Sequence, residues 1–236
     1  MKLSKILIGA VHLVIVMCIT GCNPDDIDIE LNVSDIVKAK NGEVAHAKVH
    51  IDYSTMDDDV IKDTAKLNAC KLIAQKYVGK NGKVRVKKDE MKATVSVDLK
   101  APIYNFGKPQ KFEHIQPINI GIHKDQDMLY VFEEKSITQK LNNELGRATK
   151  DKDDEFSFNT LSAEFVGDTK LSIHNDTESR FDFHLYGAFV DGEPVLMKAI
   201  QLKPGEDCEI KFPRGGSDQI YTKLDPRIFS LKVINN

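Results

Sequence analysis

Period-two alternation of apolar and polar residues recurs along this chain and restricts it to folds built on β-sheet. The clearest case is residues 27–33, where apolar side chains at odd positions alternate with polar ones at even positions. Such alternation places one face of a strand on a core and the other in solvent. Residues 44–53, 82–88 and 92–101 show a similar pattern and are also predicted to be strands.

One long helix is expected among these strands, over residues 57–78. Ser54 or Thr55 is placed to cap it, three aspartates oppose the dipole at its start, and Gly79 ends it. The predicted elements are two strands, one helix and two further strands. This order is typical of an antiparallel sheet with one packed helix. With a further hairpin over residues 118–133 and a second helix over 136–149, residues 22–150 are expected to form an α+β domain.

After the charge run at residues 150–155, only strand and turn signals follow. The candidate strands are residues 156–166, 170–174, 181–190, 194–202, 208–212 and 228–234. Their many phenylalanines suit a sheet core. We therefore expect residues 151–236 to form a separate immunoglobulin-like β-sandwich. The predicted fold class is α+β: an N-terminal antiparallel sheet with one packed helix, followed by this sandwich.

The N-terminus has the order of a secretory signal. Lys2 and Lys5 precede an apolar run over residues 6–20. This run is shorter than the about 20 apolar residues that a membrane-spanning helix needs. Ile19-Thr20-Gly21-Cys22 follows and resembles the lipobox of bacterial lipoproteins. The resemblance implies that residues 1–21 are a signal peptide removed by cleavage. It also implies that Cys22 carries acyl chains, which anchor the protein to a membrane that it does not span.

The residue after the lipobox cysteine bears on location. In lipoproteins an Asp at this position often retains the protein at the inner membrane. Asn23 stands there in this chain. By resemblance, Asn23 therefore implies anchoring on the periplasmic side of the outer membrane.

Charge and cysteine content limit the partners. Lys and Arg number 33 against 36 Asp and Glu, a net charge of -3, whereas binding nucleic acid needs a basic surface. We therefore expect no nucleic-acid partner.

Cys70 and Cys208 could pair in an oxidising compartment. Because they lie in separate predicted domains, we expect two buried, unpaired small hydrophobes instead.

No catalytic motif, cofactor motif or metal site is found. His46 and His50 have the spacing of a helical zinc pair, but their segment alternates like a strand. On a strand, four residues span about 13 Å, too far to share an ion whose bonds to nitrogen are about 2 Å long. We expect no catalytic residue, no metal and no cofactor, and hence no enzyme.

A basic stretch is the candidate binding surface. Lys83, Arg85 and Lys87 share one face of a predicted strand. On an anchored protein they would face anionic headgroups and orient the first domain. The alternative, which the pattern favours, is an edge strand whose lysines block unwanted strand pairing.

Further segments are similar to features of uncharacterised lipoproteins of bacteria and their phages or prophages. They are the strand at residues 27–33 with its Ser34-Asp35 turn, Asn175-Asp176-Thr177, Gly192-Glu193-Pro194 and residues 202–206. The resemblance implies no activity.

We expect a non-catalytic envelope lipoprotein that presents its β-sandwich to a protein partner. If the gene is phage-borne, the protein would mask a receptor or exclude superinfecting phage. The alternative is a ligand-binding or enzymatic lipoprotein with a pocket between the two domains.

Overall fold

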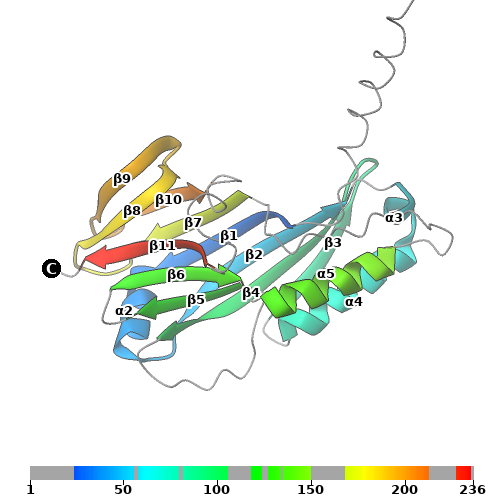
Figure 1. The fold of residues 1–236 in the computed structure, drawn as a ribbon, viewed down its shortest axis with the longest axis horizontal. Helices are drawn as coiled ribbons and strands as arrows, with labels where there is room; N and C mark the ends of the chain where they lie inside the picture. Colours follow the sequence, from blue (N-terminus) through cyan, green and yellow to red (C-terminus); the bar gives the residue numbers. More distant parts are fainter. Residues whose placement is uncertain are drawn as a thin grey trace, which may run out of the picture.

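One sheet contains every strand of the described structure (Figure 1). The computed structural model describes residues 24–55, 58–79, 82–105, 118–123, 127–133, 135–149, 168–212 and 227–234. Its strands are β1 (Pro24–Asn32), β2 (His46–Thr55), β3 (Gly82–Lys88), β4 (Ala93–Asn105), β5 (Ile118–His123), β6 (Met128–Glu133), β7 (Asp168–His174), β8 (Phe181–Val190), β9 (Glu193–Leu202), β10 (Asp207–Phe212) and β11 (Arg227–Ile234). Its helices are α2 (Val33–Asn41), α3 (Asp58–Lys62), α4 (Thr64–Val78) and α5 (Lys135–Thr149).

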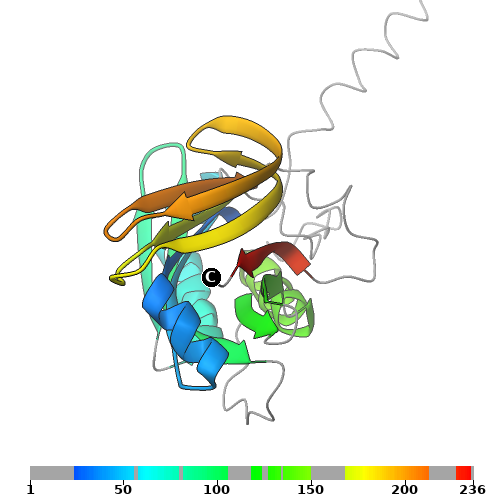
Figure 2. The ribbon, with the colours of Figure 1, turned by 90° about the vertical axis from the view of Figure 1, so that its left-hand side faces the viewer.

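The sheet is mixed and closes on itself. Its order is β10-β7-β1-β2-β4-β5-β6-β11-β8-β9, with β3 added beside β4, and β10 also pairs with β8. The β1–β7 and β4–β5 pairs are parallel. Figure 2 shows the strands wrapped around a common interior. Among the described strands, β3 pairs only with β4 and β9 only with β8, so each leaves a free edge.

The predicted fold class is wrong, because the C-terminal strands do not form a separate sandwich. β7 pairs with β1 from Asp26↔Asp168 to Asn32↔His174, and β11 pairs with β6. Alternation identifies strands and their buried faces, but it carries no information on which strands become neighbours. The predicted boundary at residues 150–155 lies outside the described residues, and strands on its two sides hydrogen-bond to each other.

The predicted helix over residues 57–78 is interrupted. Asp63 separates α3 from α4 in an extended conformation, and its carboxylate accepts hydrogen bonds from the backbone N–H groups of Ala65 (2.8 Å) and Lys66 (3.2 Å). The predicted caps Ser54 and Thr55 are therefore wrong, since both belong to β2. Gly79 follows the last residue of α4 as expected. The predicted second helix is confirmed as α5.

The apolar faces of the strands form one core. Ile29 of β1, Ile51 of β2 and Phe183 of β8 are at most 1% exposed and belong to the same cluster. α4 packs on β3 and β4, and α5 packs on α4. Both helices contribute to this core, α4 through Cys70, Ala74 and Val78, and α5 through Leu141 and Leu145. The opposite face of β1, β2 and β4 carries mostly polar side chains, among them Asp28, His50 and Asp98.

A long-range cap joins α2 to the C-terminal part of the chain. Asp176, in the loop after β7, accepts hydrogen bonds from the backbone N–H of Ser34 (2.8 Å) and from its hydroxyl (2.6 Å). Asn32, the residue before α2, makes no side-chain cap of its own. The start of α2 therefore depends on a residue far away in the sequence.

Candidate functional site

The polar side of β1, β2, β4 and β3 carries rows of facing side chains. In one row, Asp28 of β1 lies opposite His50 of β2, which lies opposite Asp98 of β4, which lies opposite Lys83 of β3. Because side chains of directly opposed residues point to the same face, these four residues share one surface. The next row on this surface holds Glu30, Lys48 and Lys100.

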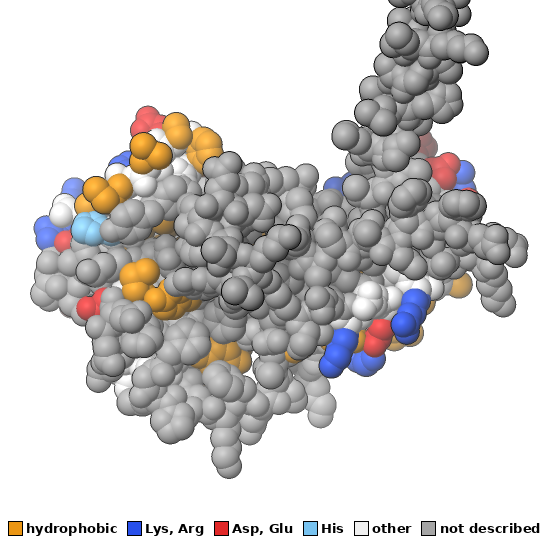
Figure 3. Space-filling model, in the orientation of Figure 1, with side chains coloured by type: hydrophobic (Ala, Val, Ile, Leu, Met, Phe, Trp, Pro, Cys, Tyr) orange, Lys and Arg blue, Asp and Glu red, His pale blue; other side chains and the backbone are white. Residues whose placement is uncertain are grey.

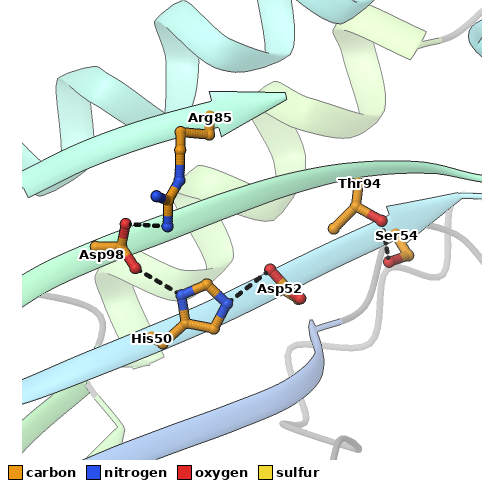
Figure 4. A network of polar contacts seen from close by, with 6 residues as sticks. All are labelled: His50, Asp52, Ser54, Arg85, Thr94 and Asp98. Atoms are coloured by element: carbon orange, nitrogen blue, oxygen red, sulfur yellow. Dashed lines mark hydrogen bonds and ion pairs between the residues drawn. The ribbon is translucent and has the colours of Figure 1, made fainter. Parts of the chain in front are cut away.

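His50 lies between Asp98 and Asp52 in a network of polar contacts (Figure 4). Its Nδ1 lies 2.7 Å from Oδ1 of Asp98, and its Nε2 lies 3.1 Å from Oδ1 of Asp52. Arg85 donates to the other oxygen of Asp98, Oδ2, at 2.5 Å. Both ring nitrogens of His50 thus lie close to a carboxylate oxygen. Both oxygens of Asp98 are therefore engaged by cationic or hydrogen-bonding groups.

This network does not have the arrangement of a nucleophilic site. A Ser–His–Asp centre needs a hydroxyl at the imidazole nitrogen that faces away from the carboxylate. At His50 that position faces Asp52, and the nearby hydroxyl of Ser54 lies 3.0 Å from the hydroxyl of Thr94 (Figure 4). In the described part of the chain, no group of three or more His, Cys, Asp or Glu residues could hold a metal ion.

The two thiols of the described residues are also poorly suited to chemistry. Cys70 and Cys208 are buried and free. Burial raises the pKa of the Cys70 thiol, and burial together with the charge of Asp191 raises the pKa of Cys208 to about 11. A thiol must ionise to act as a nucleophile. Both cysteines are therefore in environments that favour the unreactive protonated form.

An open depression of about 520 Å³ lies on the polar face. Its lining includes the His50 row together with Glu30, Lys48, Arg85 and Lys100. A second depression of about 260 Å³ shares Glu30, Lys48 and Lys100 with it and extends toward His46. Every residue lining either depression lies between positions 28 and 100. The polar face is thus the candidate ligand-binding surface of the described residues.

The structure places the predicted basic residues Lys83, Arg85 and Lys87 together. All three are exposed on one face of β3. Arg85, however, is already paired with Asp98. β3 is also a free edge of the sheet, so the alternative explanation of lysines that block strand pairing is consistent with the topology.

The strand register shows where Lys83, Arg85 and Lys87 lie relative to the predicted anchor at Cys22. Cys22 and Asn23 lie outside the described residues, and β1 begins at Pro24. Across the sheet, Asp26 lies level with Asp52, Ser96 and Arg85. With strands about 4.8 Å apart, three spacings separate β1 from β3 by about 14 Å. The start of β1 and the basic stretch therefore lie at the same end of the polar face.

The free edge formed by β9 is the second candidate surface. Leu196 is 92% exposed and Met197 is 70% exposed, whereas Ile200 and Leu202 further along β9 are buried. In Figure 3, hydrophobic side chains gather at the end of the molecule where β8 and β9 lie. Since adjacent residues of a strand point to opposite faces, β9 exposes apolar side chains on both of its faces.

A family model matches most of the chain. It is described as a domain of unknown function, DUF7424, and it matches residues 25–230. The chain belongs to this family. The matched residues run from β1 into β11, so they include strands from both predicted domains. No similar curated protein and no similar solved structure was found.

Within the described residues of this family member, no helix is long and apolar enough to cross a membrane. The longest described helices, α4 and α5, have 15 residues each.

Sequence reasoning missed several residues of these surfaces. It did not find Lys48, Lys100 or the contacts of His50 with Asp98, because they depend on strand register. It also missed the exposure of Leu196 and Met197. One signal was present: Val195, Leu196 and Met197 are three apolar residues in succession, which interrupts the alternation typical of a half-buried strand.

Proposed function

We propose that this DUF7424 family member is a non-catalytic envelope lipoprotein, anchored through Cys22, that binds a protein partner along the free edge of β9. The exposed apolar side chains of Leu196 and Met197 on that edge carry the proposal. The lipobox and Asn23 support anchoring at the outer membrane, and the resemblance to bacterial and phage lipoproteins supports an envelope location.

Strand addition is the binding mode that suits β9. A free edge offers unpaired backbone N–H and C=O groups, to which an extended segment of another protein can hydrogen-bond. Burying a Leu or Met side chain contributes about 1.5–3 kcal/mol, so covering Leu196 and Met197 would add substantially to these hydrogen bonds. Pro194 has no N–H to donate, so the backbone donors for such pairing come from other residues of β9.

The anchor is tested by substituting Cys22. In a Gram-negative host, the unaltered protein should be found in the outer-membrane fraction as a cleaved, acylated species. Cys22→Ala should leave an unprocessed or soluble form, because the acyl chains have no attachment site. A Cys22→Ala protein that is still cleaved, acylated and membrane-bound would contradict the proposed anchor.

The partner surface is tested by placing a photo-crosslinking amino acid at position 196 in cells. We expect a discrete adduct with another envelope protein, and we expect Met197→Asp to abolish it. The matched control places the same amino acid at position 203, an exposed turn position after β9. Adducts of equal yield from both positions, or none from position 196, would rule out β9 as the binding edge.

A further inference from the structure

We infer that Lys83 and Lys100 form a binding site for an anionic phosphate group in the depression on the polar face. The inference concerns a surface separate from β9. Its phosphate chemistry stands on the geometry alone, and only a membrane source of that phosphate rests on the proposed anchor.

Lys83 has no carboxylate partner among the described residues, because the carboxylate that faces it, Asp98, is engaged by other side chains. The two residues lie directly opposite each other on β3 and β4. Asp98 nevertheless contacts His50 through Oδ1 and Arg85 through Oδ2. Lys83 is exposed and has no ion pair within the described residues.

Lys100 also has no ion pair with another described residue, for a different reason. Its direct neighbour across β2 is Lys48, a residue of the same charge. Lys48 pairs with Glu30 at 2.9 Å, on the far side from Lys100. Like charges directly opposite each other are destabilising. An anion bound at Lys100 would reduce this repulsion as well as pair with Lys100 itself.

The two lysines can reach one phosphate. Lys83 lies opposite Asp98, and Lys100 is two residues further along β4, so the lysines are diagonal neighbours on one face. Diagonal neighbours on adjacent strands are about 7–8 Å apart, and two flexible lysine stems can close that distance around a group with several oxygens. Both residues line the same depression.

The acidic residues of the depression weaken the binding of an anion by Lys83 and Lys100 but do not abolish it. Glu30 is engaged by Lys48, and Asp98 by His50 and Arg85. Asp28 faces the depression from β1, at the side away from β3. Because the surface is open to water and two lysines make the contacts, we expect binding in the millimolar range, a few kcal/mol by affinity arithmetic, and strongly reduced by salt.

The first test measures labelling of individual lysines in the full-length protein in a neutral detergent. Acetylation by an amine-reactive reagent is followed by mass spectrometry, with and without inorganic phosphate, at constant ionic strength set by sodium chloride. We expect phosphate to slow the labelling of Lys83 and Lys100 several-fold and to leave Lys203 unchanged. Equal slowing at Lys203, or none at Lys83 and Lys100, would overturn the inference.

Substitutions distinguish a site from general charge attraction. Lys83→Gln with Lys100→Gln should weaken phosphate binding, measured by calorimetry, at least fivefold. The matched control, Lys198→Gln with Lys203→Gln, removes the same charge elsewhere and should leave it unchanged. Asp98→Asn removes a negative charge from the depression and should tighten binding. If it weakens binding as the double lysine variant does, the effect is structural and the inference fails.

The source of the phosphate is decided on vesicles that carry the lipidated protein. Protection of Lys83 and Lys100 on vesicles of phosphatidylcholine and phosphatidylglycerol, but not of phosphatidylcholine alone, identifies lipid headgroups. Protection by inorganic phosphate without any effect of the anionic lipid identifies a soluble phosphate compound. The measurement in detergent needs no acyl chains on Cys22, so failure of the anchor and failure of the site give different results.

Discussion

At the scale of single residues, Gly82 is a position that tolerates no side chain. It lies at the start of β3, beneath the end of α4. A Cβ atom built there would lie 2.6 Å from both Cβ and Cγ2 of Val78, atoms close to the backbone of α4 that cannot swing away. The helix can approach β3 closely because residue 82 is glycine.

Gly82→Ala should therefore destabilise the protein by about 1–3 kcal/mol, the usual cost of overpacking a core. Denaturant unfolding of the variant measures the change in free energy of unfolding. Lys87→Ala, at an exposed position of the same strand, is the control and should change it by less than about 0.5 kcal/mol. A Gly82→Ala protein as stable as the control would show that α4 can move away from β3 at no cost.

At the scale of elements, α2 is held by the long-range cap from Asp176. Removing a cap costs about 0.5–2 kcal/mol. Asp176→Ala should lower the free energy of unfolding within that range, and Asp176→Asn, which keeps one acceptor oxygen, should lower it less. If both variants are as stable as the unaltered protein, solvent can replace the cap and Asp176 does not hold α2.

The same cap should depend on pH. Partial burial raises the pKa of Asp176, but the hydrogen bonds from Ser34, together with a backbone hydrogen bond at Asp176 itself and the nearby His174, lower it more, so that the pKa lies below the usual value of 3.8. A carboxylate with a depressed folded-state pKa stabilises the protein above its unfolded-state pKa and loses this contribution as pH falls through the folded-state value. The stability difference between the unaltered protein and Asp176→Ala should be constant above about pH 5 and shrink below pH 4. A difference that stays constant down to pH 2 would contradict this.

At the scale of the whole molecule, the strand pairings join the two halves of the chain. β7 hydrogen-bonds to β1, and β11 to β6. A single cut between residues 151 and 167, at an inserted protease site, should therefore leave two fragments that stay together on size-exclusion chromatography and unfold in one transition. The two predicted domains, 22–150 and 151–236, would instead separate into a stable β-rich fragment and a remainder. Producing the two fragments separately is the control, since each should then lack neighbours for its strands.

The sequence by itself determined most of the local structure. The alternation at residues 27–33 identified β1 and the face that it buries, because side-chain direction in a strand depends only on position along it. Residues 170–174 were likewise identified as a strand, which is β7. The predicted helix over residues 136–149, which became α5, is equally local. Asp63 shows the limit of such signals: it ends one helix and caps the next, although the surrounding pattern predicts one continuous helix.

Only the tertiary structure decided which strands meet. The parallel pairing of β1 with β7 and the closure of the sheet by β10 and β8 depend on packing among residues far apart in the sequence. The candidate site has the same origin, because Lys83 and Lys100 come together through the register of β3 on β4. Period-two alternation determines which face of a strand is buried, but it does not determine which strands pair with it. The pairing depends on the free energy of the complete core.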